Sequence, residues 1–396
     1  MNIRPDQVWT TPLNEMDAVQ KGFDHTKTIR FYDTTLRDGE QSTGVCFSAD
    51  DKFEIACKLS ELGIGRIESG FPRVSEEDTQ AVKRILDAGL KSEIWGFARA
   101  LKADIDAHLE LGTQYTLIEI TTSDMKMKAF GFTREKVMTS VVDAMKYAKD
   151  KGIKRVNFFA VDSTRSDLGY LRDIYGAALE AGADEISMVD TIGVCAPETA
   201  EYLIRQVKSW FPTTPLHWHG HNDFGLATAS AIAAVRGGAD WIQGTINGMG
   251  ERAGNADLCE VALALQFLYH VPVEMDLSKA REVSNLVQKH GKYEVDSWKP
   301  VTGKYIFTRE SGGVAAQFHQ PSAIEPYSSD ILSATRHIAL GKKSGLANIK
   351  IKLDELGLSA PAEKHGAILE RVKSVGTAGK RLVTDDEFRS MVKELG

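Results

Sequence analysis

Apolar and polar positions follow two different patterns between residue 29 and residue 274. Short β-rich runs, several of them nearly continuous and apolar, predict strands buried on both faces. Segments with apolar residues three or four positions apart predict amphipathic helices. The expected strands are 29–33, 65–70, 93–98, 115–121, 155–161, 185–190, 215–218 and 241–246. The expected helices between them include 49–62, 76–88, 133–149, 168–181, 197–210 and 227–234.

The order of these elements indicates the fold class. Many of the segments end at a glycine, which suits the left-handed residue that closes a helix before the next strand. Eight regular strand–helix units predict an α/β fold of the (β/α)8, or TIM-barrel, type. The competing fold, a doubly wound open sheet, seldom needs so many regular units.

The alternation stops near residue 275. Helices are then expected at 278–290, 345–356, 362–374 and 385–395, with a loop at 291–313. We therefore divide the chain into a polar N-terminal leader (1–28), a catalytic barrel (29–274) and a small, mostly helical C-terminal region (275–396). No obvious linker precedes this last region, so we expect it to pack on the barrel or on a partner subunit.

Composition and charge narrow the class of protein. With 42% hydrophobic and 26% charged residues, the 396-residue chain has the balance of a soluble globular protein. Its net charge of −7 argues against nucleic-acid binding, and it has no apolar run of the ~18 residues that a membrane helix needs. The four cysteines form no CxxC motif, and the N-terminus resembles no secretory signal. We therefore expect a reduced, cytoplasmic protein.

The candidate metal ligands stand at strand ends, where a (β/α)8 enzyme carries its catalytic groups. Asp38 follows the first expected strand, and His219 and His221 follow the seventh. Because side chains at positions i and i+2 of a strand share a face, both imidazoles can bind one cation. Such a set leaves positions open for water or substrate and suits Mg, Mn, Zn, Fe or Co, so it does not name the reaction. A local ion pair at Asp38 and buried core histidines are the structural alternatives.

Three other strand ends also carry polar residues. Glu68 ends the second strand, Thr191 follows Asp190 at the end of the sixth, and Asn255 lies in a glycine-rich segment after the eighth. Buried acids there need partners, which a metal, Arg37 or a substrate hydroxyl would supply. A helix-cap role for Asp190 and Thr191, and a purely structural loop around Asn255, are the alternatives.

Five motifs occur in an informative order: DTTLRDGEQ (33–41), ESGFP (68–72), DTIG (190–193), HGHND (219–223) and NGMGERAGNA (247–256). Together they resemble the metal-dependent TIM-barrel family of 2-isopropylmalate, homocitrate and citramalate synthases, to which HMG-CoA lyase is more distantly related. The resemblance is strong from residue 29 to about residue 270 and weaker through 300–313 and 340–345. The chain ends about where homocitrate synthases end, so we expect no leucine-type regulatory domain.

The resemblance implies a Claisen condensation. An acyl-CoA, acetyl-CoA or a variant donor, would add to a 2-oxo acid and give a 2-hydroxy dicarboxylic or tricarboxylic acid and CoA. The resemblance implies that Asp38, His219 and His221 bind a divalent metal (Mg, Mn or Zn, with Fe or Co also possible), with Asn255 in or next to the ligand set. It also implies a homodimer, because the segment after the barrel crosses to the other subunit in that family.

The resemblance also assigns roles around the 2-oxo acid. Arg37 would stabilise the ketone oxygen as it becomes an alkoxide, and Thr191 would hold the substrate carboxylate. Glu68 would contact the substrate side chain or order water, and Gln41 and Asn255 would take part in substrate binding. A cation and a guanidinium aimed at a developing oxyanion are physically suited to this chemistry.

Two departures from the family pattern concern the other half of the site. Phe159 and Val161 stand where the family has a serine and a glutamate, and Val314 stands where it has a histidine that reaches the neighbouring subunit. His319 could replace that histidine, whereas Asp162 is expected on the opposite face of its strand. We therefore expect a retained 2-oxo-acid site with a changed second substrate, or a changed way of forming its carbanion.

Three functions are consistent with these residues. The first is the acyltransferase, and the second is a metal-dependent aldolase or lyase that needs no acetyl-CoA. A lyase of the HMG-CoA type is disfavoured, because it has a cysteine in the loop after strand eight whereas residues 248–255 have none and Cys259 lies beyond. The third is a protein that binds a 2-oxo acid and metal without turnover, which the retained Arg37 argues against.

Overall fold

The computed structural model describes residues 5–395 and divides the chain into two compact units. One unit comprises Pro12–Glu294, and the other comprises the N-terminal residues up to Thr11 together with the chain from Val295 onward. The boundary falls later than the residue 274 expected from the sequence. Helix α11 (Ala280–Gly291) explains the difference, because it packs against α2 (Ala49–Leu62) of the barrel.

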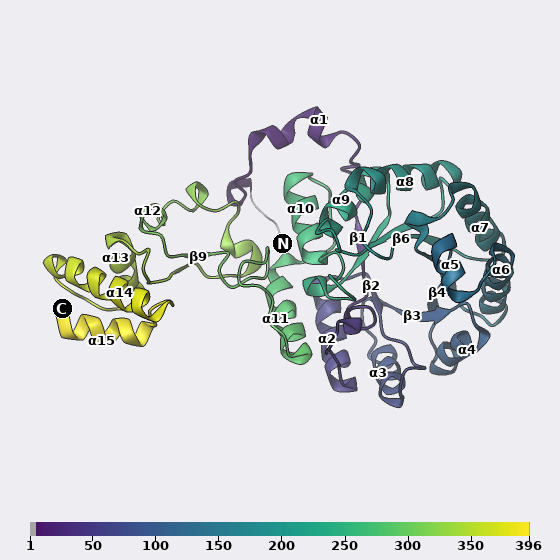
Figure 1. Ribbon diagram of the computed structural model, residues 1–396, viewed down its shortest axis with the longest axis horizontal. Helices are drawn as coiled ribbons and strands as arrows, with labels where there is room; N and C mark the ends of the chain where they lie inside the picture. The colour runs from purple at the N-terminus through teal and green to yellow at the C-terminus, as the bar shows by residue number, and fades with distance from the viewer. Residues whose placement is uncertain (1–4, 396) are drawn as a thin grey trace. The chain divides into compact units, whose positions relative to one another are not determined.

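The larger unit is a closed barrel of eight parallel strands in sequential order, which confirms the predicted TIM-barrel class (Figure 1). All eight expected strands are present, with small changes at their ends. They are β1 (Arg30–Asp33), β2 (Arg66–Glu68), β3 (Glu93–Arg99), β4 (Tyr115–Thr121), β5 (Arg155–Val161), β6 (Glu185–Asp190), β7 (Leu216–Gly220) and β8 (Trp241–Gly244).

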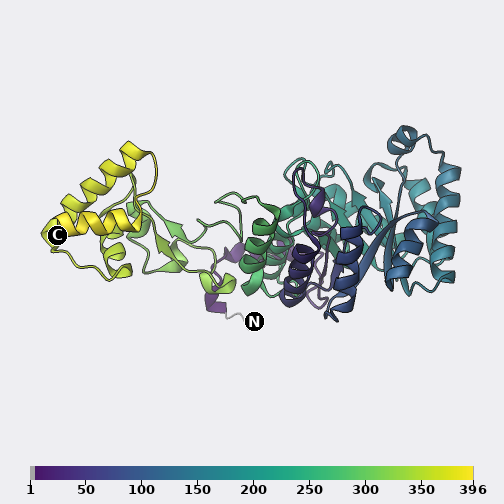
Figure 2. The same cartoon turned by 90° about the horizontal axis from the view of Figure 1, so that it is seen from below.

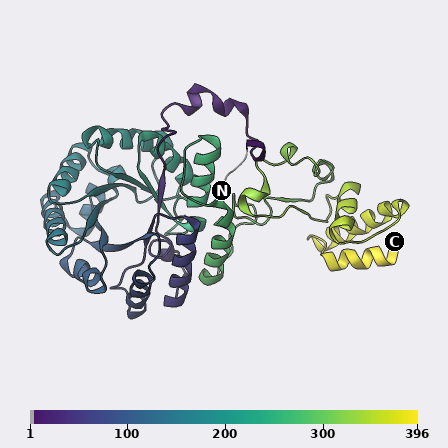
Figure 3. The same cartoon turned by 180° about the vertical axis from the view of Figure 1, so that it is seen from behind.

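Helices surround this barrel, as the opposite views in Figures 1 and 3 show. Besides α2 and α11, they are α3 (Glu76–Asp87), α4 (Lys102–Leu111), α5 (Asp124–Phe130), α6 (Arg134–Asp150), α7 (Leu168–Glu180), α8 (Pro197–Trp210), α9 (Ala227–Gly237) and α10 (Leu258–Leu268); the short α1 (Asp17–Gln20) precedes β1. Residue types at the helix ends match these bounds: Ser48 caps α2 by accepting from the Asp51 amide, and Gly63 ends it with φ 94°. Among the described residues, no helix has the length and apolar character needed to cross a membrane.

The interior of the barrel is packed rather than open. Its middle is an apolar cluster of Tyr32, Trp95, Phe97, Leu117, Phe159, Val189 and Trp241. At the amino-terminal ends of the strands, Arg66 donates to both carboxylate oxygens of Glu185 and lies over the rings of Trp95 and Trp241, 4.5 and 3.7 Å from their centroids. A buried charge needs such partners, so this end of the barrel is closed by a paired cation.

The smaller unit has a separate hydrophobic core. Three helices, α13 (Leu346–Glu355), α14 (His365–Gly379) and α15 (Asp385–Leu395), pack together around it, and Figure 2 shows them in yellow. Two short parallel strands, β9 (Thr308–Arg309) and β10 (His337–Ile338), and the short helix α12 (Gly312–Ala315) complete the unit. The N-terminal segment joins it because Val8 pairs with Tyr327. The expected loop at 291–313 therefore contains one strand and the start of a helix.

Candidate active site

Three buried side chains converge at the carboxyl end of the barrel. Strand β7 carries His219, His221 follows it directly, and Asp38 comes from the loop after β1. His219 Nε2 and His221 Nε2 lie 3.3 and 3.6 Å from Asp38 Oδ2, and 3.3 Å from each other. The ligand atoms of all three residues lie within 4.8 Å of one another. The structure therefore brings together the three residues that the sequence pattern groups as metal ligands.

The protonation of these groups suits a cation. Burial would raise the pKa of Asp38, but Arg37 and His219 hold that pKa well below its usual range. Burial lowers the pKa of His221 to about 4. At neutral pH the set therefore contains an ionised carboxylate and an imidazole with a free electron pair, the forms in which these groups bind metals.

Asn255 lies next to this set. Its Nδ2 donates to Asp38 Oδ2 at 3.0 Å, and its buried Oδ1 has no hydrogen-bond partner in the described chain. The Nδ1 atoms of His219 and His221 are likewise buried without a partner among the described residues. Unsatisfied donors and acceptors are costly in a protein interior, so these atoms indicate a place for a ligand. The donor set fits a divalent metal with open positions.

A tight loop presents Asn255. The His221–Asn255 bridge and a hydrogen bond from the Ala256 amide to the Gly220 carbonyl, 3.1 Å long, tie this loop to the end of β7. Gly254 has φ +84°, and a Cβ there would lie 1.9 Å from the Gly248 carbonyl oxygen. Only glycine fits this position, so the glycine-rich pattern serves to bring the backbone close to the ligand set.

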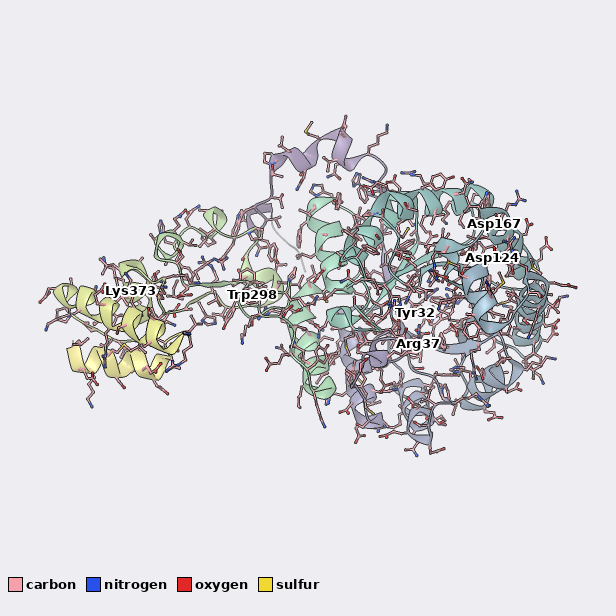
Figure 4. All side chains as sticks on the ribbon, viewed as in Figure 1. Tyr32, Arg37, Asp124, Asp167, Trp298 and Lys373 are labelled. Carbon is pink, nitrogen blue, oxygen red and sulfur yellow. The ribbon has the colours of Figure 1, made fainter. Side chains whose placement is uncertain are left out.

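Arg37 is fixed beside the cluster by Glu68. Its Nε and Nη2 donate to Glu68 Oε2 at 3.1 and 3.0 Å, and its guanidinium lies 4.3 Å from the centroid of the Phe97 ring. Nη1 lies 3.7 Å from Asp38 Oδ1. Burial raises the pKa of Glu68 although Arg37 acts against that rise. In Figure 4, Arg37 lies in the interior of the barrel, near Tyr32, whereas Asp124 and Asp167 lie out among the helices. The guanidinium is thus held in place, close to the candidate metal ligands.

The hydroxyl of Thr191 has a defined orientation. The Asp162 amide donates to Thr191 Oγ1 at 2.8 Å, which leaves the hydroxyl hydrogen free to donate elsewhere. Asp190, next to it, caps its own loop: its carboxylate accepts from the amides of Val194 and Cys195 at 3.1 and 2.9 Å. Asp190 therefore fixes the loop ahead of α8, whose N-cap is Ala196, and does not cap the helix itself, while Thr191 keeps a free donor.

A cavity of about 490 Å³ adjoins Arg37 and is lined by Gln41, Phe71 and Phe97 among others. Gln41 is exposed at this cavity, and its role in substrate binding stays a prediction. On the opposite side of the cluster, the Phe159 ring lies edge-on to His219, with 5.1 Å between centroids. Val314 and His319 belong to the smaller unit.

One acidic residue in the mouth of the barrel was missed at the sequence level. Glu119 lies on β4 in the run TLIEIT, which is predicted as a strand from the sequence without any role for its single acid. Its register with Phe159 of β5 places both side chains on the inner face. The alternation of side chains along β4 could have identified it, because alternation places Glu119 on the same inward face as Tyr115 and Leu117.

The family model described as HMGL-like matches residues 28–287. The chain belongs to the HMGL-like family. Over 369 residues it is 39% identical to the homocitrate synthase AksA of Methanothermobacter thermautotrophicus, a match that covers 93% of this chain and 94% of that protein. It is 40% identical to a putative (R)-citramalate synthase CimA of Archaeoglobus fulgidus, with 92% and 75% covered, and 39% identical to a 2-isopropylmalate synthase of Methanocaldococcus jannaschii, with 93% and 71% covered.

Solved structures support the fold of this HMGL-like chain. The HMG-CoA lyase of Bacillus subtilis superposes with a TM-score of 0.62 at 18% identity, covering 70% of this chain and 97% of that one. The HMG-CoA lyase of Brucella melitensis gives a TM-score of 0.60 at 18% identity, covering 67% and 99%. The family model and the relatives of 39–40% identity confirm the family resemblance expected from the motifs.

Proposed function

We propose that this protein is a divalent-metal-dependent acyltransferase that condenses an acyl-CoA with a 2-oxo acid to form a 2-hydroxy dicarboxylic or tricarboxylic acid and CoA. The observation that carries the proposal is the buried cluster of Asp38, His219 and His221 with the guanidinium of Arg37 fixed beside it. Its curated relatives of 38–40% identity have the names of homocitrate, citramalate and 2-isopropylmalate synthases, which supports this reaction class.

The metal would be held by Asp38, His219 and His221, with the Asn255 side chain beside them. When bound, a divalent cation supplies charge that polarises the ketone of the oxo acid. Mg, Mn and Zn all suit this mixed nitrogen and oxygen set, and Fe and Co remain compatible. The proposal includes a homodimer and a cytoplasmic location.

The chain's own residues then act on the oxo acid. Arg37 faces the ketone oxygen and stabilises negative charge that develops on it, because the guanidinium is held by Glu68 and needs no reorganisation. Thr191 donates its free hydroxyl hydrogen to the substrate carboxylate. Asn255 and Gln41 complete the contacts to the substrate.

A metal-dependent aldolase or lyase that acts without acetyl-CoA is the second candidate. It is favoured by the apolar residues Phe159 and Val161 on the inner face of β5, where the family resemblance leads us to expect a serine and a glutamate. The two candidates differ in their need for an acyl-CoA.

A turnover screen by mass spectrometry tests both. The purified protein is incubated with Mg²⁺ or Mn²⁺ and a panel of 2-oxo acids, with and without acetyl-CoA. We expect a 2-hydroxy diacid and free CoA only when acetyl-CoA is present. Cleavage or formation of a carbon–carbon bond without acetyl-CoA would establish the aldolase, and no turnover of any 2-oxo acid would contradict both.

A further inference from the structure

The inner face of β4 carries a carboxylate whose role is unassigned. Tyr115 and Leu117 belong to the apolar cluster inside the barrel, and alternation places Glu119 and Thr121 on that same face, nearer the carboxyl end. Glu119 pairs in register with Phe159, whose ring contacts the imidazole of His219. Glu119 thus lies in the mouth of the barrel, on the side of His219 that Phe159 covers.

Glu119 differs from the other acids of this site in having no fixed partner. In the part of the chain that the structure describes, its side chain makes no hydrogen bond and no ion pair. The charged groups facing it are Arg37 and Glu68 from the first two strand ends, Arg99 from β3 and Lys126 from α5. Arg37 is bound to Glu68, and Arg99 is bound to Asp104 at 2.7 and 3.0 Å. Each guanidinium is therefore engaged with another carboxylate.

This environment changes the acidity of Glu119. Burial raises the pKa of Glu119 to about 7, and the nearby Glu68 adds to that rise, while Arg37, Lys126 and Arg99 act against it. A carboxylate with a pKa near the working pH can both accept and release a proton. Half-buried carboxylates without a paired cation are found at functional sites.

Substrate can reach the carboxylate from the rim of the barrel. Glu119 and Thr121 line a cavity of about 380 Å³, together with Arg99, Phe130 and Lys136. The Thr121 hydroxyl is buried and has no hydrogen-bond partner among the described residues. This cavity therefore combines a carboxylate, two cationic side chains and an aromatic ring, and the unpaired Thr121 hydroxyl is buried at its edge.

The position of Glu119 also matches the departure in strand five. Val161, which stands where the family resemblance leads us to expect a glutamate, pairs in register with Thr121. Glu119 therefore lies on the adjacent strand, one inward-facing position earlier. We propose that Glu119 is the general base that removes a proton from the carbon next to the thioester carbonyl of the acyl-CoA. This inference rests on the proposed condensation.

The step balances within the proposed reaction. The Glu119 carboxylate takes the proton, and the electron pair of the broken C–H bond forms the enolate of the thioester, to whose oxygen Thr121 donates a hydrogen bond. The enolate carbon forms a bond to the ketone carbon of the oxo acid, and the ketone π pair moves to its oxygen beside Arg37. The protonated Glu119 gives its proton to solvent, and the alkoxide takes a proton from solvent to become the hydroxyl group. Water then attacks the thioester carbonyl, which breaks the C–S bond and releases CoA as the thiol and the second carboxylate of the product.

The variant Glu119→Gln tests the assignment, because it keeps the size of the side chain and removes the base. We expect kcat to fall about 100- to 10,000-fold, while calorimetry shows unchanged binding of Mn²⁺ and of pyruvate as the 2-oxo acid. Glu110→Gln, on the exposed face of α4, is the matched control and keeps full turnover.

Two further measurements separate proton removal from a structural role. In D2O with Mn²⁺ and oxamate, an unreactive analogue of pyruvate, the wild type should exchange the methyl protons of acetyl-CoA, and Glu119→Gln should not. The double variant Glu119→Gln/Val161→Glu should regain at least about tenfold in turnover, because it returns a carboxylate to strand five.

These experiments distinguish a failure of the Glu119 assignment from a failure of the proposed condensation. Condensation by the wild type and by Glu119→Gln at equal rates overturns the assignment of Glu119 alone. Loss of pyruvate binding in Glu119→Gln also overturns it, since the carboxylate would then hold the site rather than move a proton. A wild type that performs no condensation overturns the proposed function and this inference together.

Discussion

His217 and His219 stand two residues apart on the same face of β7, yet their surroundings differ completely. His217, near the amino end of the barrel, has partners on both ring nitrogens: Glu185 at 2.8 Å from Nε2 and the Gln243 amide at 3.1 Å from Nδ1. His219, at the carboxyl end, shares its Nε2 with Asp38 and His221, and its Nδ1 has no partner among the described residues. The sequence pattern HWHGH treats these histidines alike. A structural histidine has hydrogen-bond partners on both ring nitrogens, whereas a histidine that can bind a ligand keeps one nitrogen without a fixed partner.

The same contrast extends to the acids. Glu185 is held by Arg66 and His217, and these partners lower its pKa to about 2 although burial acts in the opposite direction. Glu119 has no such partner, and burial raises its pKa. The amino end of the barrel is therefore built for stability, and the carboxyl end keeps polar groups available for substrate.

Loss of a metal ligand should have the largest effect. His221→Ala removes one of two imidazoles from the cluster, so we expect Mn²⁺ affinity to fall by more than about 100-fold and turnover to be lost. Calorimetric titration with Mn²⁺ measures the affinity. His270→Ala, whose exposed imidazole binds Glu15 away from the cluster, serves as the control. Unchanged Mn²⁺ affinity in His221→Ala would contradict the ligand assignment.

Arg37→Ala should separate charge stabilisation from metal binding. We expect kcat to fall about 100- to 1,000-fold with metal affinity retained, because the guanidinium faces the ketone oxygen and is no ligand. Steady-state kinetics at saturating Mn²⁺ measures the change. A near-normal kcat would remove Arg37 from the reaction.

The pH dependence of kcat/KM should show whether Glu119, unlike Glu185, titrates near neutral pH. Glu119 must be ionised to act as a base, and its pKa is about 7. We therefore expect kcat/KM to fall about tenfold per pH unit below pH 7 and to be level above it. The pH profile of the wild type measures this limb, and a profile without it between pH 5 and 7 would contradict the role of Glu119.

His217→Gln should have the smallest effect on turnover and act on stability instead. Loss of the imidazole leaves Glu185 and Gln243 without one buried partner each, which costs about 1–3 kcal/mol of unfolding free energy. Urea denaturation measures the loss, and the affinity for Mn²⁺ should be unchanged. If His217→Gln reduced metal affinity as strongly as His221→Ala, the distinction between the two ends of the barrel would be wrong.

Much of this structure can be predicted from the sequence because it depends on local patterns. Several of the eight strands are nearly continuous apolar runs. The spacing of His219 and His221 places both on one face without knowledge of the fold. Helix α10 is harder to recognise, because its sequence LCEVALALQFL is apolar on nearly every side and shows no amphipathic period. The rest depends on contacts between distant segments: that Arg37 is held by Glu68 and that Asp190 caps its own loop follow from backbone positions that no short pattern contains.

The role of Glu119 also could not be predicted from the sequence. Strand alternation predicts which face it occupies, but the absence of a partner is a property of the folded interior, where Arg37 and Arg99 are already engaged. Without that information, a single acid in an apolar strand carries no functional meaning.

The glycine at position 254 has a consequence for saturation mutagenesis of this chain. It contacts no substrate in the proposed reaction and has no chemistry of its own, yet any side chain there would overlap the Gly248 carbonyl and displace the loop that holds Asn255. In a map of mutational tolerance, position 254 should therefore score as intolerant as Asp38 or His221. A functional screen would count it among the active-site residues, although its only contribution is the absence of a side chain, which lets the loop pass close to the Gly248 carbonyl.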